Sequence, residues 1–186
     1  MGQEFETLVL NINPEEIKSK LRKLGAKEEP EVLQKRWVFD IKCDGSTAGE
    51  WIRLRQANGK STVTYKNRIG SGISETEEIE VHVDDFDDTA KILSKLKCFT
   101  DKHYQENKRI NFELDGIEFT LDTWPLIPTI LEIESKNEEK VKEGLKLLGL
   151  EGKDVGHIGL IQIYSKFGID LHSHKELKFK KEKTKR

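Results

Sequence analysis

Two dipeptides typical of tight hairpin turns, Asn58-Gly59 and Asp115-Gly116, each lie between segments in which polar and apolar side chains alternate. Such a turn needs positive φ at both central residues, which Asn, Asp and Gly adopt at low cost. Alternation places every second side chain on the same face of a strand. The two turns therefore predict two antiparallel hairpins and a fold built mainly of strands.

The same alternation recurs along the chain, and we expect eight strands. They are 3–10, 32–41, 51–56, 61–66, 77–83, 104–114, 117–122 and 129–134. Capping residues and apolar spacing predict helices from Asn13 to Gly25 and over about 85–97, 137–148 and 154–168, and residues 70–72 form a loop. Eight antiparallel strands with few helices indicate an α+β fold whose sheet is closed into a barrel or left as a sandwich.

The composition bounds the organisation of the chain. Its 186 residues are 35% hydrophobic and 35% charged, which predicts one domain over 1–170, followed by a basic tail over 171–186 that we expect to be disordered. Because 32 basic residues nearly balance 34 acidic ones, a nucleic-acid partner held by general electrostatic attraction is not expected. No apolar leader or membrane-length apolar run is evident, so we expect a cytoplasmic protein without membrane contact.

Like-charged residues two apart recur on the polar faces of four predicted strands. These pairs are Glu4 with Glu6, Arg53 with Arg55, Glu78 with Glu80, and Glu132 with Glu134. Side chains two apart share a face and repel each other, so each pair is costly unless a counter-charge, a metal ion or a phosphate lies between neighbouring strands. A solvated face accepts any polar residue and is the alternative for each strand taken alone. A barrel interior lined by acids and bases explains the repetition better.

The types of residue indicate a chemistry. Clustered carboxylates favour a hard divalent cation, since Mg²⁺ and Mn²⁺ prefer oxygen ligands. Arginine pairs match phosphate oxygens through two parallel hydrogen bonds, and Lys66 adds a point charge. Together these groups suit a metal-bound polyphosphate, in which the metal and the guanidinium groups stabilise charge on the phosphoryl group being transferred. The five histidines show no ligand spacing.

Seven short motifs, in order over about residues 3–168, resemble the CYTH domain, or triphosphate tunnel metalloenzyme, family. The motifs are Glu4-Phe5-Glu6, Trp51-Ile52-Arg53-Leu54-Arg55, Thr64-Tyr65-Lys66, Glu78-Ile79-Glu80, Lys108-Arg109, Leu121-Asp122 and Leu131-Glu132-Ile133-Glu134. The family includes class IV adenylyl cyclases, thiamine triphosphatases and inorganic triphosphatases. The resemblance implies a closed eight-stranded antiparallel β-barrel, called the tunnel, with flanking helices.

The resemblance also implies a role for each matching residue. Those expected to hold one or two Mg²⁺ or Mn²⁺ ions are Glu4, Glu6, Asp122, Glu132 and Glu134. Those expected to bind the triphosphate and act in catalysis are Arg53, Arg55, Lys66 and Arg109, with Glu78 and Glu80 as further acidic contributors to substrate binding.

One position departs from the family's Glu-x-Glu-x-Lys motif, because Leu8 stands where the lysine is expected. An apolar side chain at this position removes one cation from the tunnel. Either another base such as Lys35 or Arg36 replaces it in binding the substrate, or the activity is weaker, altered or lost.

These observations predict a metal-dependent triphosphate enzyme acting on tripolyphosphate, thiamine triphosphate or ATP. In the hydrolase, water attacks the terminal phosphorus. In the class IV adenylyl cyclase, the ribose 3′-hydroxyl of ATP attacks the α-phosphorus and pyrophosphate leaves. The stretch 24–27, with Gln34 and Phe39-Asp40, resembles the cyclase branch, but hydrolysis needs no base pocket and is preferred. A module that binds a polyphosphate or nucleotide without turnover is the third reading, and a homodimer is left open.

Overall fold

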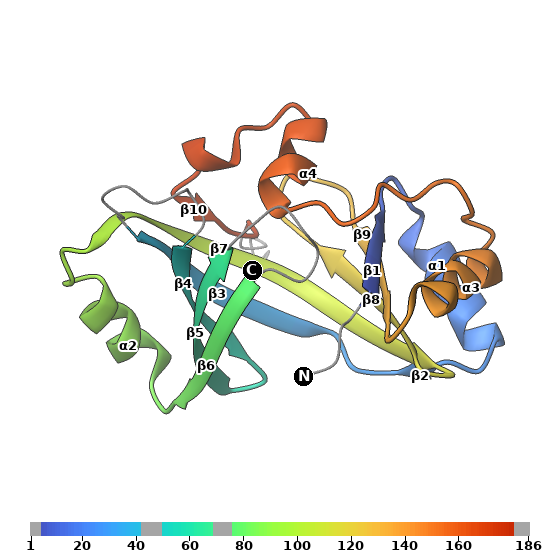
Figure 1. Ribbon diagram of the computed structural model, residues 1–186, viewed down its shortest axis with the longest axis horizontal. Coiled ribbons are helices and arrows are strands. Elements are labelled where there is room, and N and C mark those ends of the chain that lie inside the picture. The colour runs from blue at the N-terminus through green and yellow to red at the C-terminus, as the bar shows by residue number, and fades with distance from the viewer. Residues whose placement is uncertain (1–4, 42–49, 69–75, 181–186) are drawn as a thin grey trace, which may run out of the picture. The chain divides into compact units, whose positions relative to one another are not determined.

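The computed structural model describes residues 5–41, 50–68 and 76–180, and Figure 1 shows their arrangement. The strands are β1 (Phe5–Val9), β2 (Lys27–Glu28), β3 (Val32–Ile41), β4 (Glu50–Ala57), β5 (Lys60–Arg68), β6 (Thr76–Val83), β7 (Phe99–Leu114), β8 (Ile117–Thr123), β9 (Ile130–Ser135) and β10 (Glu176–Leu177). The helices are α1 (Pro14–Lys23), α2 (Phe86–Leu93), α3 (Glu138–Leu148) and α4 (Leu160–Lys166), followed by a 3₁₀ turn at Leu171–Ser173. The loop expected at 70–72 lies outside the described residues.

The sheet confirms the antiparallel α+β fold but not its closure. Its order is β1-β9-β8-β7-β3-β4-β5-β6, with β2 and β10 added beside β7. Within the described ranges, β1 and β6 stand at the two ends of this order and do not pair with each other. The sheet is therefore open there, and the closed eight-stranded barrel that the resemblance implied is not found.

The chain forms two compact units. Unit 1 comprises residues 1–32 and 107–173, and unit 2 comprises residues 33–106 and 174–186. Strand β7 is 16 residues long and contributes to both units. The single domain over 1–170 stays a prediction.

Unit 1 is built on the hairpin of β7 and β8. The turn between them has positive φ at Asp115 and Gly116, 52° and 76°, as the dipeptide predicted. Strand β9 pairs with β8, and β1 pairs with β9. Helices α1 and α3 lie beside this part of the sheet (Figure 1), and Asn13 and Asn137 cap them as expected. The core of unit 1 includes the fully buried Leu21, Ile117, Phe119, Leu131 and Ile133.

Unit 2 is built on the hairpin of β4 and β5, whose turn has positive φ at Asn58 and Gly59. Strand β6 pairs with β5, and β3 pairs with β4. Helix α2 ends at Leu93, earlier than expected, and its buried Phe86 joins a core with the fully buried Phe39 and Leu54. The apolar face of the β4–β5 hairpin is therefore the face that this helix covers.

The C-terminal region differs from the prediction in two ways. The helix expected over 154–168 forms only as α4, because residues 154–156 instead run beside β1. The segment expected to be disordered contains the 3₁₀ turn and β10, which pairs in parallel with Tyr104 and Gln105 of β7. Leu177 is 2% exposed, so one apolar residue in a lysine-rich stretch supplies a buried contact. No helix in the described ranges has the length and hydropathy to span a membrane.

We predict that Gly144→Ala destabilises unit 1. A Cβ atom at Gly144 in α3 would lie 2.8 Å from Cγ2 of Ile133 and 3.2 Å from Cγ2 of Ile117, both fully buried. Overpacking a core costs about 1–3 kcal/mol, and the better helix propensity of alanine offsets up to about 1 kcal/mol of this. We expect a net loss of roughly 1–2 kcal/mol in urea unfolding, whereas Glu143→Ala on the exposed side of α3 should change stability by under about 0.5 kcal/mol. An unchanged midpoint for Gly144→Ala would show that α3 can move away from the sheet.

Candidate functional site

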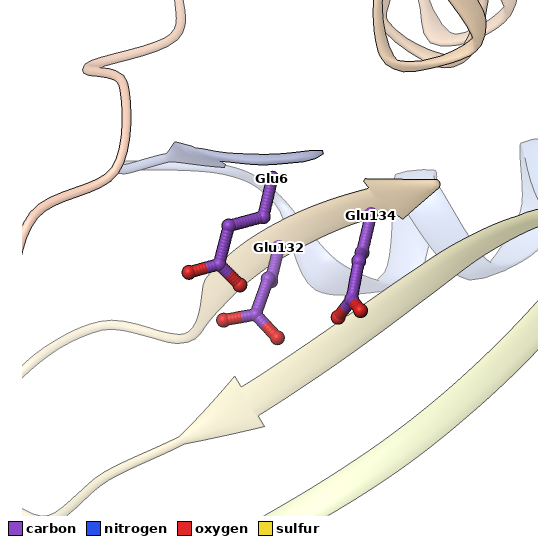
Figure 2. Close-up of side chains that lie close together, drawn as sticks. All are labelled: Glu6, Glu132 and Glu134. Atoms are coloured by element: carbon purple, nitrogen blue, oxygen red, sulfur yellow. The ribbon is translucent and has the colours of Figure 1, made fainter. Parts of the chain in front are cut away.

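Three glutamates of unit 1 converge on one face of the sheet, and Figure 2 shows their side chains pointing to the same side. Glu6 lies on β1, and Glu132 and Glu134 lie on β9. Glu6 is directly opposite Glu134 in the antiparallel register. Ligand oxygens of the three carboxylates all lie within 4.8 Å of one another. We name Glu6, Glu132 and Glu134 the acid cluster.

The acid cluster exists because β9 alternates. Leu131 and Ile133 belong to the core of unit 1 and are fully buried, so Glu132 and Glu134 must point to the opposite face. The strand pairing then brings Glu6 to the same place. Burial of the apolar face of β9 therefore places the glutamates of β9 and β1 together on the opposite face.

The charge state of Glu132 reflects this crowding. Burial raises the pKa of Glu132 to about 7, Arg109 acts against that rise, and the charges of Glu6, Asp122 and Glu118 add to it. Such a pKa means that the protein alone disfavours the carboxylate form of Glu132 at neutral pH. A bound cation would favour that form.

Arg109 and Asp122 form a two-point ion pair beside the cluster. Nε and Nη2 of Arg109 donate to the two carboxylate oxygens of Asp122 at 2.8 and 2.5 Å, and Nδ2 of Asn107 donates to the same carboxylate at 2.8 Å. The guanidinium of Arg109 also lies 3.9 Å from Glu132. Burial lowers the pKa of Arg109, but Asp122 more than reverses this and the net pKa is raised. Asp122, predicted as a metal ligand, is thus held by Arg109 and Asn107 and is not part of the acid cluster.

The donor set of the acid cluster fits a divalent cation. Three carboxylates offer oxygen ligands from two strands, and Arg109 is the counter-charge whose contact to Glu132 is described above. Hard ions such as Mg²⁺ and Mn²⁺ bind oxygen ligands of this kind. Glu4, also predicted as a ligand, lies outside the described residues.

Four predicted cations of unit 2 share one face of β3, β4 and β5. Arg36 is opposite Arg55, and Arg53 is opposite Thr64, which has the same orientation as Lys66 two residues on. We name Arg36, Arg53, Arg55 and Lys66 the cation face. The strand alternation predicted the shared orientation of Arg53 and Arg55, whereas the orientation of Arg36 could not be chosen from the pattern and follows from its pairing with Arg55.

The carboxylates predicted on β6 are counter-charges to the cation face. Nζ of Lys66 lies 2.8 Å from Glu78, and Nη2 of Arg53 and of Arg55 lie 3.8 and 3.9 Å from Glu80. The hydroxyl of Thr64 donates to Glu80 at 2.6 Å and lowers the pKa of Glu80; burial acts against this, and the nearby arginines reinforce it. In unit 2, therefore, a neighbouring strand supplies part of the compensation that the arginine pair requires.

Two members of the cation face repel each other. Arg36 and Arg55 stand directly opposite each other, which is unfavourable for like charges. Nη2 of Arg36 donates to Oε1 of Gln34 at 3.1 Å, an uncharged partner. An anion would relieve this repulsion, and a phosphate matches the two-point hydrogen bonding of arginine.

The pairing of β1 with β9 shows which residues lie next to Leu8, the position that departs from the family motif. Leu8 shares the face of Glu6 and stands opposite Glu132, and it is 5% exposed. The departure from the family motif therefore places a buried apolar side chain beside the acid cluster.

Three residues that touch these groups were not predicted. Thr64 and Asn107 share the parity of Lys66 and Arg109, so the alternation could have identified them. Nδ1 of His157 contacts a carboxylate oxygen of Glu6 from a loop, where no periodic signal exists. A cavity of about 580 Å³ in unit 2 is lined by residues of α2 and of the two positions after it, together with Trp37 and Lys102, and contains none of the predicted site residues.

We predict that Glu132 makes the metal-free protein less stable as pH rises. An acid whose pKa is raised from 4.5 to about 7 on folding adds no penalty below pH 4.5, and the penalty grows as the unfolded chain ionises first. In EDTA, the free energy of unfolding of wild type should fall between pH 5 and 8 by roughly 2 kcal/mol more than that of Glu132→Gln. Parallel profiles for the two proteins in urea unfolding would contradict this.

Solved structures from several organisms share the fold. The PH1012 protein from Pyrococcus horikoshii OT3 is 24% identical, with a TM-score of 0.67, and the match covers 83% of this chain and 96% of that chain. A protein proposed to be an adenylate cyclase, from Vibrio parahaemolyticus, is 16% identical, with a TM-score of 0.67 and coverage of 89% and 99%.

HpAC1 from Hippeastrum, proposed to be an adenylyl cyclase and found to have a dominant triphosphatase activity, is 19% identical, with a TM-score of 0.57 and coverage of 90% and 96%. A comparison with proteins of curated function found no match. The family model of the CYTH domain matches residues 3–164. Since this match spans most of the sequence, the chain belongs to the CYTH domain family.

Proposed function

We propose that this chain is a divalent-metal-dependent enzyme that hydrolyses the terminal phosphate of an inorganic or organic triphosphate. The observation that carries the proposal is the convergence of Glu6, Glu132 and Glu134 within 4.8 Å. A half-buried cluster of carboxylates in which the pKa of one member is raised, first by burial and further by nearby carboxylates, is a functional-site signal, because repulsion between them does not stabilise the fold. The metal would be Mg²⁺ or Mn²⁺, held by the acid cluster.

The acid cluster, the cation face and Arg109 have different roles in the proposed reaction. When bound, the metal would withdraw charge from phosphate oxygens. Arg53 and Arg55 bind phosphate oxygens through their guanidinium groups, and Lys66 neutralises further charge. Arg109 was predicted to bind the triphosphate, but its contacts with Asp122 and Glu132 instead support a role in fixing Asp122 and limiting the repulsion around Glu132. Arg36 adds the fourth cation of the cation face. We therefore expect residues of the acid cluster and residues of the cation face each to contribute to turnover.

The candidate substrates are tripolyphosphate, thiamine triphosphate and ATP. The triphosphatase activity of HpAC1 supports hydrolysis as a reaction of this fold. The Vibrio parahaemolyticus protein proposed to be an adenylate cyclase supports the second candidate, cyclisation of ATP. Hydrolysis ranks first because it requires only that the triphosphate be held, and none of the contacts described above identifies a nucleobase.

We predict metal-dependent orthophosphate release that depends on both groups of residues. Orthophosphate, pyrophosphate and cyclic AMP would be measured with each substrate and Mg²⁺ or Mn²⁺. Glu132→Gln and Arg55→Ala should each lower kcat about 100-fold or more, because each removes a group that helps to stabilise charge on the phosphoryl group being transferred. The control is Arg22→Ala, which removes an exposed arginine paired with Glu28 and should leave kcat unchanged.

The products separate the candidates. Orthophosphate identifies the hydrolase, and pyrophosphate with cyclic AMP from ATP identifies the cyclase. Triphosphate binding without release of any product would overturn the enzyme proposal and leave a binding module.

The binding module has one observation in its favour, the buried Leu8 opposite Glu132. Leu8→Lys restores the family motif and discriminates the two. For an enzyme adapted to leucine we expect kcat close to wild type, whereas a module that lost its chemistry at this position should gain turnover by about 100-fold. Circular dichroism of Leu8→Lys verifies that a lysine at this buried position leaves the fold intact.

A further inference from the structure

A histidine, which carries a metal-binding imidazole, contacts one member of the acid cluster. Nδ1 of His157 contacts a carboxylate oxygen of Glu6. The His157 side chain is 48% exposed and that of Glu6 is 26% exposed, so an ion from solution can reach both. His157 belongs to the loop between α3 and α4, and no strand carries it.

The loop holds His157 in place through β1, the strand that also carries Glu6. The backbone N–H of Val155 donates to the carbonyl of Leu8 at 2.8 Å, and the N–H of Leu8 donates to the carbonyl of Gly156 at 3.3 Å. The hydroxyl of Thr7 donates to Asp154 at 3.0 Å. Residues 154–156 therefore lie along β1 much as another strand would.

The chain turns directly before His157. Gly156 has a φ of 70°, in the left-handed region that glycine adopts without strain. The turn follows the last backbone bond to β1 and leaves the imidazole against Glu6. Both the backbone bonding and the turn thus fix the position of His157 relative to the acid cluster.

We propose that His157 is a nitrogen ligand of the metal held by Glu6, Glu132 and Glu134, and that it shifts the preference of this centre from Mg²⁺ toward transition-metal ions such as Mn²⁺ and Co²⁺. This inference rests on the proposed metal-dependent function. Mg²⁺ binds almost entirely through oxygen, whereas imidazole is a ligand for first-row transition metals. An imidazole added to three carboxylates therefore strengthens binding of the second class of ion selectively.

The competing role for His157 is to orient Glu6 by a hydrogen bond without touching the metal. His157→Asn separates the two roles, because the amide of asparagine can donate a hydrogen bond to Glu6 from near the position of Nδ1 but does not replace an imidazole ligand. His157→Ala removes both functions. His172→Ala is the matched control, since His172 is an exposed histidine of unit 1 at the far end of the sequence from Glu6.

The experiment measures Mn²⁺ bound to the full chain without substrate, by electron paramagnetic resonance. Wild type and His172→Ala should show electron spin echo modulation from a ¹⁴N nucleus coupled to Mn²⁺, and both His157 variants should lose it. Mn²⁺ affinity should fall about tenfold or more in both His157 variants, while Mg²⁺ affinity measured by competition changes much less. Circular dichroism verifies the fold of each variant.

Three outcomes would overturn the inference. Mn²⁺ that binds wild type without ¹⁴N coupling, and is lost in Glu132→Gln, leaves the metal centre intact but removes His157 from it. Wild-type Mn²⁺ affinity in His157→Asn makes His157 a positioning residue. Wild type that binds no Mn²⁺ contradicts the proposed function itself, and the failure of the two proposals is thereby distinguished.

Discussion

Repulsion between like charges on one face of a strand is the constraint on which the rest of this structure depends. The two units compensate for this repulsion in different ways. In unit 2, Glu78 and Glu80 stand beside the arginines and Lys66 and cancel part of their charge. In unit 1, Arg109 lies near Glu132 of the acid cluster, and it also donates two hydrogen bonds to Asp122. In both units the compensation described is partial, and a bound anion in unit 2 or a bound cation in unit 1 would add to it.

The cost of the acid cluster is met by the opposite face of the same strand. Raising the pKa of Glu132 from 4.5 to about 7 corresponds to roughly 3 kcal/mol of unfavourable free energy for the ionised form. Burying Leu131 and Ile133 against the helices stabilises the fold by about 1.5–3 kcal/mol each. The alternation in β9 therefore stabilises unit 1 through its apolar face and brings carboxylates together on its polar face, and the packing of the apolar face offsets the electrostatic cost.

The sequence predicted what is local and periodic. Alternation and the two hairpin turns identified the eight main strands, the face of Glu132 and Glu134, and the face of Arg53 and Arg55, and the seven motifs identified the family. Pairings between strands that are distant in the sequence could not be predicted, because alternation gives orientation but not register. The position of Leu8 opposite Glu132 is of this kind, whereas Arg109 and Asp122 face each other across the β7–β8 hairpin, whose turn was predicted. His157 was missed because it comes from a loop fixed by backbone bonds, which leave no side-chain pattern.

Leu8 links the departure from the family motif to the chemistry of the acid cluster. A lysine opposite Glu132 would place an ammonium next to the cluster and lower the pKa of Glu132, since an opposite charge favours the carboxylate. Leu8 is instead a buried apolar side chain opposite Glu132, and burial is the largest cause of the raised pKa of Glu132. Arg109 supplies positive charge at 3.9 Å from Glu132, and a bound ion would supply more. A metal that binds only the folded chain would also stabilise unit 1.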